Sequence, residues 1–177
     1  MPFALGALGV VALLAPPGVA ANHTPGVTTL LRQASKLVGA RYPTAVLYEA
    51  DGTTAGGRAT STAAGIVTWR FWFGGFSTRS GIASASVSFG PAPKRFGSVR
   101  GYRSPVLEDV PIRKVPKMTL GRAVTDLRHA GYHDAFTGVT LRNPLGPHRS
   151  NPLYIFTTTH HGYVTVDTKT GRVAVIR

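Results

Sequence analysis

The basic side chains between positions 94 and 122 are the densest group of chemically active residues in this sequence. Two acidic residues, Glu108 and Asp109, oppose eight basic ones, which are Lys94, Arg95, Arg100, Arg103, Arg113, Lys114, Lys117 and Arg122. Such a density of positive charge attracts phosphate, anionic wall polymer, membrane headgroups or an acidic protein face. Five prolines between 91 and 116 predict an extended, exposed segment. It is therefore either a contact strip or a solubilising linker.

An aromatic and cationic pair on a predicted strand, residues 65–73, is a second candidate binding site. Because successive side chains of a strand alternate between its faces, this segment has two different sides. One side carries Val67, Trp69, Phe71 and Phe73, and the other carries Ile66, Thr68, Arg70 and Trp72. The first set predicts a core. Arg70 and Trp72 have the composition of a protein-binding hot spot, unless another part of the chain covers Trp72, as is usual for tryptophan.

Catalytic chemistry finds no support in the remaining motifs. Glu108 and Asp109 are neighbours, but in an extended segment their side chains point in opposite directions and form no acid–base pair. The chain has no Gly-x-Ser-x-Gly, no phosphate-binding loop and no His-Glu-x-x-His. The absence of cysteine excludes disulfides, thiol catalysis and cysteine-ligated zinc. We expect a protein that is not an enzyme and that uses no cofactor.

Four histidines have spacings that invite a test for metal binding. His129 and His133 are four residues apart, but Gly131 between them is expected to end a helix and so separate their side chains. His160 and His161 precede Gly162 in a predicted turn, where solvated polar residues belong. We therefore expect these histidines to be solvated surface residues and predict no metal site there.

The first twenty residues predict a secretory signal peptide. They carry no charged side chain, their apolar stretch 3–14 is followed by Pro16-Pro17-Gly18, and small residues come next. The usual Lys or Arg near the start is absent. About twelve apolar residues are too few to cross a hydrocarbon core of roughly 30 Å. Cleavage after residue 20 is the prediction, and retention as an anchor is the alternative.

Cleavage after Ala20 would create a new terminus that begins Ala21-Asn22-His23. A free amine, two backbone amides and a third-position imidazole form a square-planar nitrogen set suited to Cu(II) or Ni(II). The alternative is a short leader with an incidental histidine. A shift of one residue in the cleavage position would remove the site.

The elements that must position these residues follow the order helix–strand–strand–strand twice. Apolar periodicity predicts helices at 28–40 and 119–130, the second capped by Thr119 and ended by Gly131. Alternating or apolar runs predict strands at 45–50, 65–73 and 82–89, and again at 135–142, 153–159 and 163–176. A turn is predicted at Asp51-Gly52. The division is a signal peptide at 1–20, a first unit at 21–90, a basic Pro-rich linker at 91–117 and a second unit at 118–177.

The second unit resembles a PepSY-type domain over residues 118–177. The residues that carry the resemblance are a helix ending in Ala130-Gly131-Tyr132, then two strands, then the hairpin Tyr163-x-x-x-Asp167-x-x-Thr170-Gly171-x-Val173. In that hairpin Asp167 can bond its own backbone and Gly171 accepts a positive φ. The resemblance implies a small secreted module that binds or restrains peptidases, without cofactor or catalytic set. The tandem layout is also similar to that of beta-lactamase inhibitor proteins, which rely on disulfides that this chain cannot form.

These patterns predict an α+β fold of two tandem units, each a helix packed on an antiparallel sheet, after a cleavable signal peptide. We expect a secreted, non-catalytic binding module or peptidase inhibitor whose partner is an extracellular protein. The alternative is a cell-envelope protein that docks on an anionic polymer through its basic linker, with membrane contact at most peripheral. A small hydrolase with unfamiliar motifs is a third interpretation. Two aromatic rings in the linker, Phe96 and Tyr102, are too few for base stacking, so no nucleic-acid partner is expected.

Overall fold

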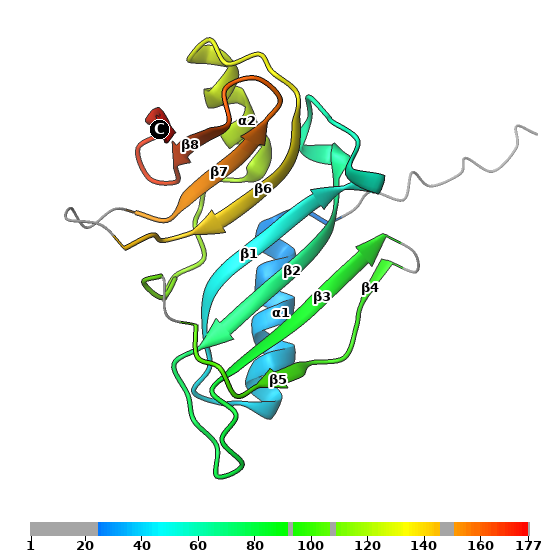
Figure 1. The fold of residues 1–177 in the computed structure, drawn as a ribbon, viewed down its shortest axis with the longest axis vertical. Coiled ribbons are helices and arrows are strands. Elements are labelled where there is room, and N and C mark those ends of the chain that lie inside the picture. Colours follow the sequence, from blue (N-terminus) through cyan, green and yellow to red (C-terminus); the bar gives the residue numbers. More distant parts are fainter. Residues whose placement is uncertain (1–24, 92–93, 107–108, 146–150, 177) are drawn as a thin grey trace, which may run out of the picture.

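The computed structural model describes residues 25–91, 94–106, 109–145 and 151–176. Within these residues the protein is α+β, with nine strands in one antiparallel sheet and two helices packed against it (Figure 1). The predicted signal peptide at 1–20 and the candidate metal-binding terminus at 21–23 lie outside the described residues.

The sheet has the strand order β4-β3-β2-β1-β6-β7-β8-β9, and β5 pairs with β3 on the same edge as β4. The helices are α1 (Val27–Arg41) and α2 (Leu120–His129), with single 3-10 turns η1 (Ala55–Gly57) and η2 (Ala63–Gly65); the strands are β1 (Val46–Thr54), β2 (Ile66–Gly74), β3 (Ser84–Pro91), β4 (Lys94–Phe96), β5 (Arg100–Tyr102), β6 (Phe136–Arg142), β7 (Leu153–Thr158), β8 (Tyr163–Asp167) and β9 (Val173–Ile176). The pairing of β1 with β6, from Glu49↔Arg142 to Thr53↔Gly138, joins the two parts of the chain. They share one sheet, a point that the sequence left open.

The two helices pack through the apolar stripes that the periodicity predicted. In α1, Leu30, Leu31, Ala34 and Val38 are fully buried. Leu37 has the helical spacing of the same apolar stripe, seven residues after Leu30, but is 42% exposed. At about 100° per residue, Leu37 lies about 20° beyond Leu30, on the side away from Leu31 and Val38, and so at the rim of the stripe.

The shorter helix, α2, has the cap and the end that the sequence predicted. The side chain of Thr119 accepts a hydrogen bond from the backbone N–H of Arg122 at 3.2 Å. Leu120, Ala123 and Leu127 are buried against the sheet. Gly131, with φ of 90°, follows the helix and reverses the chain.

The region around Gly52 differs from its prediction. β1 continues through Asp51-Gly52 instead of turning there. Gly52 lies opposite Trp69, and a Cβ on Gly52 would lie only 2.8 Å from the indole ring. The glycine therefore makes room for a buried tryptophan within a strand, and it does not serve a turn.

The start of β2 also departs from simple alternation. The register shifts between Thr53 and Thr54, so Ile66 is buried with 3% exposure while Val67 is only partly buried. The assignment of Val67 to the core and Ile66 to the other face was wrong. A bulge of this kind turns the next side chain to the opposite face. From Trp69 onward the predicted alternation holds, because Trp69, Phe71 and Phe73 are all buried.

The segment predicted as a linker, 91–117, contains ordered pairing. β4 and β5 both pair with β3, and Ile112 forms an isolated bridge with Leu47. Phe96 packs against Phe89, with ring centroids 5.4 Å apart. The basic segment is thereby held against the edge of the sheet.

The sheet has a covered face and a face that carries no helix, which we call the open face. Figure 1 shows α1 behind β1, β2 and β3, leaving the near side of these strands without a helix. Residues that lie opposite each other on paired antiparallel strands share a face, so the pairing register shows which residues lie side by side on the open face. One row across it reads Leu153, Arg142, Glu49, Trp72, Ser86 and Arg100, and the next reads Ile155, Thr140, Asp51, Arg70 and Ser88.

Candidate functional site

Arg70 and Trp72 lie together on the open face, as the sequence predicted. Trp72 is partly buried, and its ring centroid lies 5.3 Å from that of Tyr102 on β5. The guanidinium carbon of Arg70 lies 5.9 Å from the centre of the Trp72 ring. This cation–π contact holds Arg70 over the aromatic pair and leaves the arginine itself exposed.

A pocket of about 350 Å³ adjoins this aromatic pair on the open face. Its lining comes from β2, β3, β5 and the connection between β4 and β5, and consists of Arg70, Ser86, Ser88, Gly97, Ser98, Arg100 and Tyr102. The hydroxyls of Ser86 and Tyr102 are hydrogen-bonded at 3.1 Å. The backbone N–H of Gly97 donates to the carbonyl of Ser88 at 2.8 Å, which fixes the connection over the pocket.

The electrostatics of this pocket are one-sided. Both of its charged residues, Arg70 and Arg100, are exposed arginines, and no carboxylate belongs to the lining. Among the described residues neither arginine forms an ion pair. The hydroxyls of Ser88 and Ser98 likewise have no hydrogen-bond partner within the described part of the chain. The pocket therefore presents several unsatisfied donors around a positive centre.

A second cluster of charge occupies the middle of the open face, where β1 meets β6. Arg142 pairs with Asp109 at 2.7 Å and lies 3.8 Å from Glu49. The side chain of Thr140 donates a hydrogen bond to Asp51 at 2.9 Å. A separate pocket of about 360 Å³ is lined by Glu49, Asp51, Thr140, Arg142, Ile155, Tyr163 and Ile176. The charges in this cluster satisfy one another.

The carboxyl of Glu49 holds a proton at neutral pH. Its pKa is raised to about 8, first by burial and then by the neighbouring charge and hydrogen bond of Asp51, while Arg142 acts in the lowering direction. A protonated Glu49 lets two carboxyls share one strand face without repulsion. No sequence motif indicated this cluster, although Glu49 and Asp51 are two residues apart on a strand and so predict a shared face.

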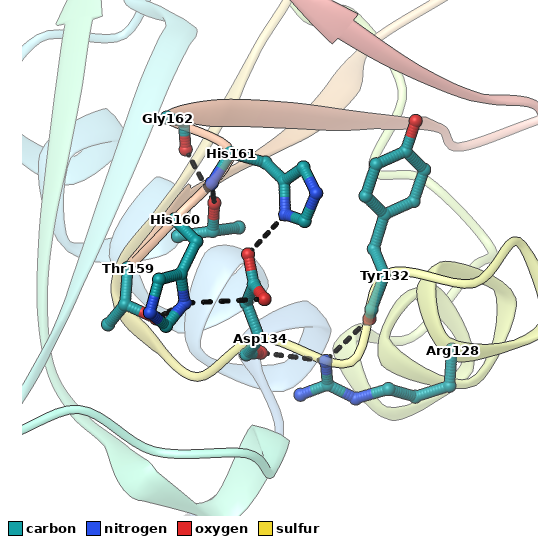
Figure 2. A network of polar contacts seen from close by, with 8 residues as sticks. Arg128, Tyr132, Asp134, Thr159, His160, His161 and Gly162 are labelled. Carbon is teal, nitrogen blue, oxygen red and sulfur yellow. Dashed lines mark hydrogen bonds and ion pairs between the residues drawn. The ribbon is translucent and has the colours of Figure 1, made fainter.

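The histidines at 160 and 161 form a polar network with Asp134 (Figure 2). The Nδ1 atom of His161 is hydrogen-bonded to one carboxylate oxygen of Asp134, and His160 lies 3.5 Å from the other oxygen. His161 also meets the ring of Tyr132 edge to face, at 5.3 Å. The hydrogen bond with His161, and after it the charges of His161 and His160, lower the pKa of Asp134. The network ties the connection after α2 to the β7–β8 turn, and His133 takes no part in it.

Within the part of the chain that the structure describes, no group of three or more acidic or histidine side chains has the arrangement of a metal site. The contacts of Asp134 with His160 and His161 connect two surface elements. His129 and His133, the other pair weighed from the sequence, are both exposed.

The predicted basic residues fall into two groups in space. Arg70 and Arg100, far apart in the sequence, meet in one pocket with Trp72 beside them. Arg95 lies opposite Gly90 on the same edge of the sheet. The other described members of the set are exposed and are not part of the pocket lining, namely Arg103, Arg113, Lys114 and Lys117. Nothing is described of the Lys94 side chain.

The serine side chains of the pocket were not predicted as a site. The alternation Ser84-x-Ser86-x-Ser88 predicts a solvent-exposed serine face on this strand, but Ser84 and Ser86 are buried and only Ser88 is partly exposed. The arrival of Arg100, Tyr102 and Ser98 beside them depends on the pairing of β5 with β3. That pairing joins residues that no local pattern connects.

Comparison with known protein families, with curated proteins and with solved structures finds no match for this chain. No helix among the described residues is both long and apolar enough to cross a membrane. Function is therefore inferred from the geometry of the open face.

Proposed function

We propose that this protein is a secreted, non-catalytic binding module of the peptidase-inhibitor-like kind. It docks an acidic face of an extracellular partner protein on the β2–β3–β5 end of the open face. One observation carries the proposal: an aromatic pair, Trp72 and Tyr102, lies beside two arginines that have no acidic partner in the described chain. Interface hot spots are enriched in tryptophan, tyrosine and arginine.

The proposal extends to the organisation of the chain. A cleaved signal peptide, residues 1–20, would deliver the module outside the cell, and two tandem helix-on-sheet units would then share one sheet through β1 and β6. The hairpin around Asp167 supports a PepSY-like second unit. Its carboxylate accepts hydrogen bonds from the backbone N–H groups of Lys169 and Thr170 at 2.8 Å each, and Gly171 has φ of 73°.

The test compares how well three forms of the full chain capture an extracellular partner protein. The three forms are the unchanged protein, Trp72→Ala and the control Leu37→Ala. Leu37 is an exposed apolar residue on α1, on the other side of the sheet. Loss of a hot-spot tryptophan is expected to weaken partner binding about 30-fold. Leu37→Ala should bind as the unchanged protein does, and binding should survive a wash at about 1 M salt. Equal capture by all three forms would overturn the proposal.

A second function rests on the exposed basic segment. Every described basic side chain between 95 and 117 is exposed to solvent, which favours docking on an anionic envelope polymer. Charge reversal at Arg103 and Arg113 with Trp72 intact separates the two functions. Polymer docking would be lost in that variant and released at about 1 M salt, because screening and counterion release both oppose it. Docking on a shaped protein face would persist.

A further inference from the structure

The shape and the hydrogen-bond donors of the pocket beside Trp72 indicate the chemical class of its ligand more closely than positive charge alone would. Ser86 and Ser88 lie two residues apart on β3 and form its floor. Arg70 lies opposite Ser88 on one side of this strand, and Arg100 lies opposite Ser86 on the other side. From strand spacing and rise, the Cα atoms of the two arginines are about 12 Å apart, so both guanidinium groups can meet over the floor.

The number of donors exceeds what a single carboxylate uses. Each guanidinium offers several N–H groups, and Ser88 and Ser98 each offer an O–H with no other partner among the described residues. One more O–H remains from the Ser86 and Tyr102 pair, since only one of the two donates in their mutual bond. A planar carboxylate has two oxygens and is fully bound by one arginine. It would leave the second arginine and the hydroxyls without a partner.

The charge of the pocket also favours a ligand with more negative charge than a single carboxylate. Two arginines face it and no carboxylate does. A phosphate monoester carries a charge of about −1.5 to −2 at pH 7 and has three strong acceptor oxygens in a tetrahedral arrangement. Its charge balances the two guanidinium groups, and its oxygens can receive bonds from both walls and from the floor.

We infer that the pocket formed by Arg70, Arg100 and the serine hydroxyls is a binding site for one phosphate monoester group. This inference deepens the proposed function, since a partner that docks on the open face can present such a group. Phosphate binding can be measured without the partner protein, so a failure of this inference can be distinguished from a failure of the proposed function. If phosphate binds but no partner is captured, only the proposed function is contradicted. If a partner is captured in a Trp72-dependent way but phosphate does not bind, only this inference is contradicted.

The first experiment is calorimetric titration of the purified full chain with inorganic phosphate, glycerol 2-phosphate and acetate at low ionic strength. Glycerol 2-phosphate is expected to bind at least tenfold more tightly than acetate. Arg70→Gln and Arg100→Gln should each weaken phosphate binding about tenfold or more, and the double variant should abolish it. Arg113→Gln, which removes the same charge outside the pocket, should bind within twofold of the unchanged protein. Equal losses in all three single variants would overturn the inference, because they would indicate a diffuse charge effect.

The dependence on pH supplies a readout that a generic basic patch would not give. The second proton of a phosphate monoester has a pKa of about 6, whereas sulfate keeps its double charge throughout the range from pH 5 to 7.5. Affinity for glycerol 2-phosphate is expected to fall several-fold between pH 7.5 and pH 5 relative to that for sulfate. The sulfate titration corrects for a protein group that titrates nearby, the carboxyl of Glu49 on β1. A constant ratio between the two ligands would contradict the assignment.

Competition then tells whether the group is free or belongs to the partner. If the captured partner presents the phosphate, glycerol 2-phosphate at a saturating concentration will displace it from the unchanged protein. If the ligand is a free small molecule, capture will be unaffected by it while the calorimetric binding remains.

Discussion

The two charge clusters of the open face lie side by side on the same sheet but differ in whether their charges are paired within the protein. In the middle cluster, on β1 and β6, Arg142 pairs with Asp109 and Glu49 keeps its proton. At the β2–β3–β5 end, Arg70 and Arg100 have no acidic partner among the described residues. A cluster that is satisfied internally contributes to the fold. A cluster that leaves its charge open costs little to keep at the surface and is available to a ligand.

The largest expected effect that separates the two clusters is on folding stability. Asp109 has a side chain that is only 3% exposed, so Arg142→Ala would remove the Arg142 ion pair from a buried carboxylate. We expect a loss of about 3 kcal/mol in the free energy of unfolding, measured by urea denaturation. Arg100→Ala is the matched control and should change stability by less than about 0.5 kcal/mol. Similar losses in both variants would show that the clusters do not differ in this way.

A smaller effect sharpens the comparison through pH. The pKa of Glu49 is about 8 in the folded protein and about 4.5 when the chain is unfolded, so between these values the folded state binds more protons. Stability therefore falls as pH rises from about 4.5 to 8. Glu49→Gln should remove this slope and, at pH 8.5, make the protein more stable than the unchanged chain by about 2 kcal/mol. This expected difference is well below the free energy that corresponds to the whole pKa shift of Glu49, because water screens this partly exposed carboxyl.

The control for this measurement is Thr140→Val, which removes the hydrogen bond to Asp51 and leaves the titratable carboxyl of Glu49 in place. Its stability should keep the downward slope of the unchanged protein. A Glu49→Gln variant whose stability still falls across this range would remove Glu49 as the source of the pH dependence.

The smallest expected effect concerns the network at Asp134, whose two histidine partners are exposed and which belongs to neither cluster. Because the pKa of Asp134 is lowered in the folded protein, its contribution is present above the ordinary value near 3.8 and is lost as pH falls through the lowered one. Asp134→Asn should lower Tm slightly at pH 6, and this difference should disappear once the pH falls below the lowered pKa of Asp134, as followed by circular dichroism. A large loss at pH 6 would mean that this network stabilises the fold as strongly as the middle cluster does.

Local patterns predicted those elements whose structure depends on near neighbours in the chain. The α2 cap at Thr119, the chain reversal at Gly131 and the self-bonded turn at Asp167 all follow from residues within a few positions of each other. The pairing of Arg70 with Trp72 on one strand face was likewise predictable, because alternation along a strand is local. The signal peptide and the domain boundaries stay predictions.

Errors in the predicted elements arose where a distant residue decides the local conformation. Gly52 looks like a turn residue beside Asp51, yet it is a strand position whose missing side chain admits Trp69. Ile66 is buried in place of Val67 because the register between β1 and β2 shifts there. In both cases the deciding partner lies more than ten residues away, so local periodicity could not reveal it.

By itself the sequence determined which residues could form helices and strands and which side of each element is apolar, since those properties depend on spacing along the chain. The tertiary structure decided which strands pair. The β1–β6 pairing assembled the middle cluster from Glu49 and Arg142, and the β3–β5 pairing brought Arg100 to the serines and to Arg70. The physical reason is that strand pairing is chosen by the packing of the whole sheet against both helices. That choice depends on contacts between residues far apart in the chain.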